Sequence, residues 1–85
     1  DNLKLDSKIP VNELSSDLKD SLDHAINKLS KVRKEVFKLA YIEGYSHKEI
    51  AEKLNISVRT VETHIYKAVQ QLRKILALIY ILLHI

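Results

Sequence analysis

The stretch at residues 46–76 constrains the fold of this chain most, because it fits two consecutive helices joined by a tight turn. Ser46 is followed three residues later by Glu49, the spacing of a capping box at a helix start. Asn55 stands where the first helix must end in a left-handed residue, and asparagine is the best choice there after glycine. Ser57 can then cap the second helix. These local signals predict a short helix, a turn and a longer helix in close succession.

The second of these helices is amphipathic. At about 100° per residue, one side is apolar, with Val58, Val61, Ile65, Ala68, Val69, Leu72, Ile75 and Leu76. The other side carries Arg59, Thr63, Tyr66, Lys67, Gln70, Arg73 and Lys74. Such side chains can reach phosphates and base edges, although the solvated face of an ordinary amphipathic helix has a similar composition. Together with the turn, the pattern predicts a helix-turn-helix whose second helix enters a DNA major groove.

The remaining sequence favours an all-α fold with four helices. The 85 residues suffice for one small domain, 46% of them are hydrophobic, and the chain has one glycine and one proline. Apolar residues at helical spacing predict a helix at about residues 12–29 and another at about residues 31–43. Val32, Val36, Leu39 and Ala40 form the core stripe of the latter, and Gly44 stands where its C-cap would be.

The two ends of the chain are less regular. Residues 1–11 are polar, hold the only proline and are expected to form a linker or arm before a domain at residues 12–77. Residues 78–85 form an apolar tail that is much shorter than the ~20 residues needed to span a bilayer. The chain has no methionine and begins at Asp1, so we expect it to be a fragment of a longer protein.

We expect the last helix to run at least one turn past Ala77. Ile79 and Leu83 would then continue its core stripe. This leaves Leu78, Ile81 and Ile85 to be covered by another protein surface, by a second copy or by nothing, if the end frays.

Charge is unevenly distributed along the chain, whose net charge is +3. Residues 1–30 hold six acids and four bases, whereas residues 31–85 hold ten bases and five acids. The basic excess therefore falls in the half with the predicted helix-turn-helix, as a polyanionic partner requires, although a chance scatter of a few charges is the alternative.

Other chemistries find little support. The chain has no cysteine, which excludes disulfides and thiolate metal sites and fits a cytoplasmic protein. Its four histidines lack metal-ligand spacing, and no phosphate loop or nucleophile motif occurs. We therefore expect neither a cofactor nor an enzymatic activity.

Several short motifs occur together between about residues 22 and 77. They are RKEVF at residues 33–37, EG at 43–44, S-x-x-EIA at 46–51, S-x-x-TV-E-x-H at 57–64, KA at 67–68 and LR at 72–73. In this combination the run resembles region 4 of the extracytoplasmic-function (ECF) sigma factors of bacterial RNA polymerase. The chain departs from that pattern near Ser30 and Lys31, where the family often has proline, and at Asn55, where it often has glycine.

The resemblance implies a four-helix domain, unrelated to the winged helix, that recognises the −35 promoter element. It also implies docking on the flap of the polymerase β subunit and, in many cases, capture by an anti-sigma factor. Base contacts would come from Arg59, Thr60, Glu62, Thr63, Tyr66 and Lys67. The family often has a base where Glu62 stands, and this carboxylate can accept from cytosine N4 or pair with Arg59 or Tyr66. The expected phosphate contacts are Arg33, Ser46, His47, Lys48, Ser57, His64, Gln70, Arg73 and Lys74.

Two other hypotheses remain open from the sequence. A LuxR-type effector domain of a response regulator has a similar pattern and would usually dimerise on an inverted repeat. A helical protein-interaction module would use the same basic face against an acidic protein. A receiver domain upstream of Asp1 would favour the first alternative, and salt-dependent binding to duplex DNA would argue against the second.

Overall fold

The computed structural model describes residues 8–84, and this part of the chain is helical, without strands. The elements are the 3-10 turn η1 (Val11–Glu13), α2 (Ser16–Ile26), α3 (Lys31–Phe37), the π-helical segment η2 (Lys38–Ile42), α4 (His47–Leu54) and α5 (Val58–Leu83). Because η2 continues α3 directly, the four helices α2 to α5 account for the architecture. The predicted all-α fold with a helix-turn-helix is confirmed.

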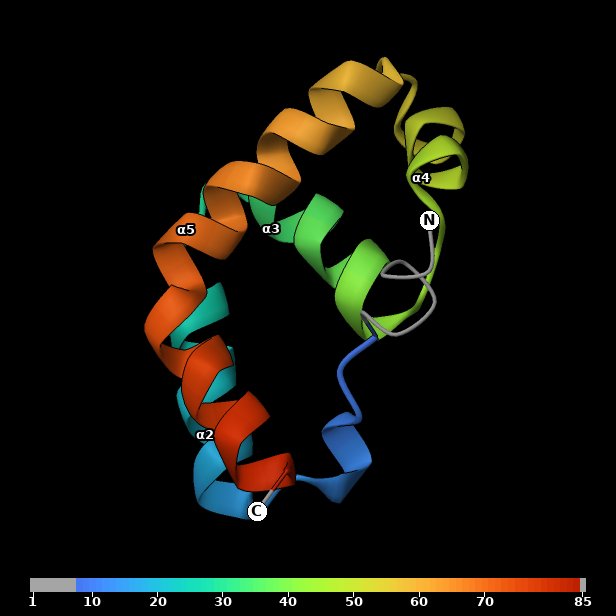
Figure 1. The fold of residues 1–85 in the computed structure, drawn as a ribbon. Coiled ribbons are helices and arrows are strands. Elements are labelled where there is room, and N and C mark those ends of the chain that lie inside the picture. Colours follow the sequence, from blue (N-terminus) through green and yellow to red (C-terminus); the bar gives the residue numbers. More distant parts are fainter. Residues whose placement is uncertain (1–7, 85) are drawn as a thin grey trace.

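The 26-residue helix α5 organises the domain (Figure 1). The helix α4 lies beside its N-terminal part, α3 crosses near its middle, and α2 lies beside its C-terminal part. Each of these helices contacts α5. One helix therefore packs against all three of the others.

Two clusters of buried side chains meet at α3. Val36 and Phe37 are adjacent in sequence and both have 0% exposure, yet they belong to different clusters. Neighbouring side chains on a helix point about 100° apart, so α3 can fill both clusters at once. The cluster around Val36 comprises Ala40, Ile50, Ala51, Val61 and Ile65. The cluster around Phe37 comprises Ile9, Leu14, Leu18, Leu22, Ile26, Leu29, Ala68, Leu72 and Ile79.

The first predicted helix, at residues 12–29, is shorter in the structure. Leu14 is extended, with φ −84° and ψ 147°, and it separates η1 from α2. Ser15 is the N-cap of α2, because its Oγ accepts from the Leu18 N–H at 3.2 Å. The apolar spacing crosses this boundary without a break, so periodicity alone placed the helix start too early.

The second predicted helix, at residues 31–43, begins at Lys31 as expected, with Ser30 in an extended N-cap conformation. Its second half is the π-helical η2, in which the Glu43 N–H donates to the Lys38 carbonyl at 3.0 Å. Gly44 follows with φ +81°, and the Tyr45 N–H donates to the Leu39 carbonyl at 2.9 Å. The C-cap of η2 is therefore Glu43, one residue earlier than predicted, and Gly44 is the residue with positive φ that follows it.

Two residues that were assigned to core stripes and that lie near the start of their helices are exposed instead. Val32 has 45% exposure and Val58 has 39%. Each lies in the first turn of its helix, α3 or α5, where the neighbouring elements do not cover it. The prediction for these two positions is wrong because a helical stripe says nothing about how far along the helix its neighbours extend.

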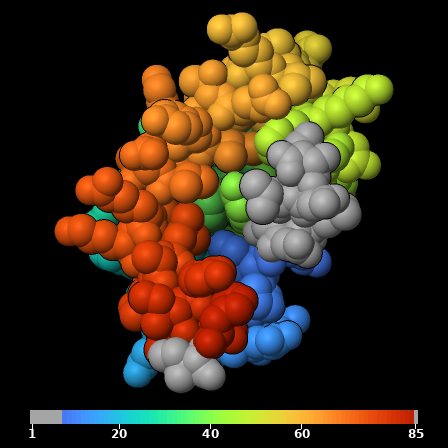
Figure 2. Space-filling view, viewed as in Figure 1, coloured from blue at the N-terminus to red at the C-terminus, as the bar shows by residue number. Residues whose placement is uncertain are grey.

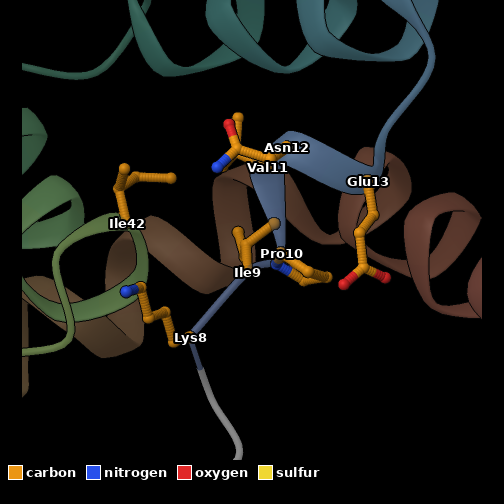
Figure 3. A pocket seen from close by; sticks show the side chains of 7 residues that line it. All are labelled: Lys8, Ile9, Pro10, Val11, Asn12, Glu13 and Ile42. Carbon is orange, nitrogen blue, oxygen red and sulfur yellow. The ribbon is translucent and has the colours of Figure 1, made fainter.

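The segment before η1 is packed onto the domain (Figure 3). Ile9 is 8% exposed, and its N–H donates to the Tyr41 carbonyl of η2 at 2.6 Å. Lys8 to Glu13 and Ile42 line a hollow beside this contact. The end of the expected arm at residues 1–11 thus contributes to the core, while residues 1–7 lie outside the described part.

The C-terminal tail continues α5 as far as Leu83 without a break. Ile79 is 4% exposed and joins the core, as predicted, but Leu83 is 37% exposed, so the prediction that it continues the core stripe is wrong. Leu78 and Ile81 are exposed, as expected, and Ile85 lies outside the described residues. Among residues 8–84, no helix is long and apolar enough to cross a membrane.

Candidate nucleic-acid interface

The turn between α4 and α5 is fixed by local hydrogen bonds. The Ser46 Oγ accepts from the Glu49 N–H at 3.1 Å, and the Ser46 N–H donates to the Glu49 Oε1 at 2.8 Å. These bonds from Ser46 lower the pKa of the Glu49 carboxyl below its ordinary value. At the start of α5, the Ser57 Oγ accepts from the Thr60 N–H at 3.0 Å. The predicted capping box and both caps are confirmed.

Asn55 is the left-handed residue at the corner of the motif, with φ 56° and ψ 48°. The next residue, Ile56, donates its N–H to the Ala51 carbonyl at 3.0 Å, which closes the C-terminal end of α4. Only three residues therefore separate α4 from α5, and the start of α5 is held at a fixed angle to α4. This angle decides which side chains of α5 face outward.

We expect Asn55→Gly to preserve or raise the free energy of unfolding, and Asn55→Val to lower it by about 1–2 kcal/mol. Glycine adopts φ near 56° without strain, whereas a β-branched side chain clashes with its own backbone there. Urea unfolding followed by circular dichroism measures both changes. Glu52→Val, at an exposed position within α4, controls for the low helix propensity of valine. An equal loss at both valine positions would contradict the assigned strain.

The first two turns of α5 separate polar from apolar side chains cleanly. Val61 and Ile65 are buried against α3 and α4. All six residues predicted to contact bases are exposed, namely Arg59, Thr60, Glu62, Thr63, Tyr66 and Lys67. Tyr66 is the aromatic residue of this group, and 66% of its side chain is exposed. The structure thus brings the six side chains to one solvent-facing surface, which we call the recognition surface.

Internal hydrogen bonds limit what some of these groups can offer a ligand. The Thr63 Oγ1 donates to the Arg59 carbonyl at 3.0 Å, so its hydroxyl is left as an acceptor. The Thr60 Oγ1 lies 2.8 Å from the Ser57 Oγ. Arg59 and Lys67 supply cationic donors beside these hydroxyls. The recognition surface therefore combines acceptors, donors and an aromatic face, a set that suits base edges and methyl groups.

Glu62 pairs with α4 rather than with its own helix. Its Oε2 lies 3.5 Å from the His47 Nδ1, at the long limit of a hydrogen bond. The sequence had suggested Arg59 or Tyr66 as the alternative partner of this carboxylate. His47 reaches Glu62 because the turn sets the start of α4 beside the start of α5. One predicted phosphate contact and one predicted base contact are therefore joined in the free domain.

The nine predicted phosphate contacts differ in accessibility. Ser46, Lys48, Ser57, Gln70, Arg73 and Lys74 are exposed, whereas Arg33, His47 and His64 are half-buried. The hydroxyls of Ser46 and Ser57 are already engaged as helix caps. The exposed cations extend along α5 beyond the recognition surface. These cations can approach the phosphates of a nucleic acid without any rearrangement of the protein core.

Arg33 joins α3 to the middle of α5. Its Nη1 donates to the Gln71 Oε1 at 2.7 Å, whereas its buried Nε has no hydrogen-bond partner in the described part of the chain. The Nδ1 of His64 is also buried without such a partner. Burial lowers the pKa of His64 below its ordinary value, and the nearby charges of Arg33 and Lys67 lower it further. Both effects favour the neutral form of His64.

Gln71 was missing from the predicted site. It holds the Arg33 guanidinium, so it decides where that cation lies relative to α5. The only sequence signal is its spacing, because His64, Lys67 and Gln71 recur at helical intervals on one side of α5. That spacing shows that the three residues share a face of α5. It does not show that Gln71 contacts Arg33 on α3, 38 residues away in the sequence.

Nothing in residues 8–84 indicates a metal centre, since no group of three or more histidine, aspartate or glutamate side chains is arranged to hold an ion.

The acidic residues of α2, namely Asp17, Asp20 and Asp23, lie on the helix that contacts the C-terminal part of α5. They are thus remote from the recognition surface. This placement keeps these three carboxylates away from the recognition surface, on which Glu62 is the one acidic side chain among the six.

Comparison with protein families identifies a family to which the chain is similar. The family model described as "Sigma-70, region 4" matches residues 19–72, well over half of the chain. The matched range begins in α2 and includes α3, α4 and the recognition surface on α5. Comparisons with curated proteins and with solved structures found no significant match.

Proposed function

The chain belongs to the sigma-70 region 4 family, whose domains bind the −35 promoter element, and we propose that it does so as part of an ECF sigma factor. The supporting observation is the recognition surface, in which six side chains of α5 face outward beside a capped turn. The family match favours this function over the LuxR-type effector domain and over a protein-interaction module.

The proposal assigns a role to each part of the surface. Lys67, Thr63 and Arg59 read base edges in the major groove, with Tyr66 against a base or methyl group. Glu62 accepts from cytosine N4 once DNA displaces it from His47. The phosphate contacts come from the side chains around them: Arg33, Ser46, His47, Lys48, Ser57, His64, Gln70, Arg73 and Lys74. Phosphate contacts fix the register of the helix, and base contacts give specificity.

The same proposal names the protein partners. In a holoenzyme the domain would dock on the flap of the polymerase β subunit, in the cytoplasm, where an anti-sigma factor can also capture it. The domain has no catalytic role in this scheme. It positions the polymerase, whose own active site performs the chemistry.

We expect Lys67→Ala and Thr63→Val to weaken binding to the preferred duplex by about 1–3 kcal/mol each and to relax base preference. Selection from a randomised duplex library with the 85-residue chain identifies that duplex, and fluorescence anisotropy at low salt measures each affinity. The two positions lie one turn apart, and both are exposed.

Arg73→Ala is the matched control, because Arg73 is exposed on α5 but lies beyond the first two turns. It should weaken all duplexes by similar factors, as the loss of a phosphate contact does. A uniform loss in all three variants, with unchanged base preference, would show that α5 does not read bases.

A further inference from the structure

One contact joins the two helices of the helix-turn-helix near their N-terminal ends. The Nδ1 of His47, in the first turn of α4, lies 3.5 Å from the Oε2 of Glu62, in the second turn of α5. In the space-filling view, the surface of α4 adjoins that of the first turns of α5 at one end of the molecule (Figure 2). Within residues 8–84, His47 is the one ion-pair partner of Glu62. The contact therefore links a predicted phosphate contact directly to a predicted base contact.

Both side chains of this contact are open to solvent. The side chain of His47 is 22% exposed and that of Glu62 is 56% exposed. A contact of this length between such groups is weak, and exposed pairs shift an equilibrium by only about twofold to fivefold. An approaching ligand can therefore separate the two groups at little cost.

The chemistry of the two groups limits how many partners His47 can have. An ionised carboxylate only accepts hydrogen bonds, so the Nδ1 of His47 carries the proton in this contact. In a neutral imidazole the other ring nitrogen, Nε2, is then an acceptor. Phosphate oxygens also only accept, so this Nε2 has no proton to donate to them. Neutral His47 therefore donates either to Glu62 or to a phosphate, but not to both.

We propose that His47 couples base reading by Glu62 to the binding of a phosphate. Where the duplex presents cytosine to Glu62, the carboxylate accepts from N4 and leaves His47 free to donate to the backbone. Where the duplex presents thymine, O4 is an acceptor that repels the carboxylate, so Glu62 stays on His47. The coupling rests on the proposed DNA-binding function. It makes His47 a positioning residue whose backbone contact depends on sequence.

An ordinary phosphate contact behaves differently, because it stabilises all duplexes alike. Lys48 provides the matched case, since it follows His47 in α4, is exposed and is also a predicted phosphate contact. Within the described part of the chain, it forms no ion pair with a carboxylate. The contribution of Lys48 should therefore not depend on the base that Glu62 reads.

Two duplexes test the coupling. The first is the preferred duplex from the randomised library, and Glu62→Ala identifies the base pair whose preference depends on this carboxylate. We expect that pair to place cytosine at Glu62. The second duplex differs from the first only by a thymine–adenine pair at this position. Fluorescence anisotropy at about pH 8, where an ordinary histidine is neutral, measures each affinity.

We expect His47→Ala to weaken binding about fivefold on the cytosine duplex and no more than about twofold on the thymine duplex. In the Glu62→Ala background the two losses should be equal, since His47 is then free on both duplexes. Lys48→Ala should weaken both duplexes by the same factor in either background. A merely structural role of His47 would lower both affinities equally. Circular dichroism confirms that each variant is folded.

NMR of the His47 ring nitrogens tests the position of the proton without DNA. At about pH 8, the form with the proton on Nδ1 should be more populated in the wild type than in Glu62→Ala. Equal populations in the two proteins would overturn the coupling, because His47 would then not donate to Glu62 in the free domain.

The binding data separate failure of the coupling from failure of DNA recognition. Equal losses for His47→Ala on the two duplexes would overturn the coupling, as would a Glu62→Ala variant that keeps the preference for cytosine. In both cases a wild-type chain with base preference would still support the proposed function. A wild-type chain that binds no duplex with base preference would overturn the proposed function and the coupling with it.

Discussion

Replacing Phe37 with alanine is expected to lower the free energy of unfolding by about 3–5 kcal/mol. The ring has 0% exposure and stacks on Tyr41, with 4.8 Å between centroids. It belongs to the cluster in which buried side chains of α2 and α5 meet Ile9, Leu14 and Leu29. Its removal loses the transfer free energy of the ring and leaves a cavity that helices held by caps and turns cannot close.

The loss is large relative to the whole domain. Small domains are stable by only about 5–15 kcal/mol, so the variant should be close to unfolding at 37 °C. Urea unfolding followed at 222 nm measures the change. Phe37→Leu, which keeps most of the volume, should cost less than half as much.

Tyr66→Ala provides the matched control, because it also removes an aromatic ring but from a side chain with 66% exposure. Its effect on unfolding should stay within about 0.5 kcal/mol. If the two alanine variants lost similar free energy, Phe37 would not be the packing centre that links α3 to α2 and α5.

Binding to duplex DNA should weaken roughly 250-fold between 50 and 200 mM salt, which corresponds to a slope of about −4 in a plot of log K against log salt concentration. Four exposed cations of α5 carry most of this dependence: Arg59, Lys67, Arg73 and Lys74. Within the described residues, none of them forms an ion pair with a carboxylate. They are therefore available to replace the counterions of about four or five phosphates.

Fluorescence anisotropy over a salt series measures the slope. Arg73→Gln should make it less steep by about one unit, since one phosphate contact is lost. Lys19→Gln, on α2 and remote from the recognition surface, is the control and should leave the slope unchanged. An affinity that does not change over this salt range would rule out the electrostatic binding mode.

The helix-turn-helix was predictable because its signals are local. The bonds between Ser46 and Glu49 span three residues, as does the cap from Ser57 to Thr60. Asn55 adopts the left-handed conformation that its position in the sequence required. The outward orientation of the recognition surface follows from helical periodicity once the helix start is known. Errors arose at Val32 and Val58, where exposure depends on how far neighbouring helices extend.

The all-α fold, the capped turn and the outward side of α5 could be predicted from the sequence alone, because each depends on residues within a few positions of one another. The contacts of Arg33 with Gln71 and of Glu62 with His47 could not, because they depend on the packing of separate helices. The burial that lowers the pKa of His64 also comes from the packing of the helices. These features join side chains on different helices, up to 38 residues apart, and depend on how the helices pack around α5.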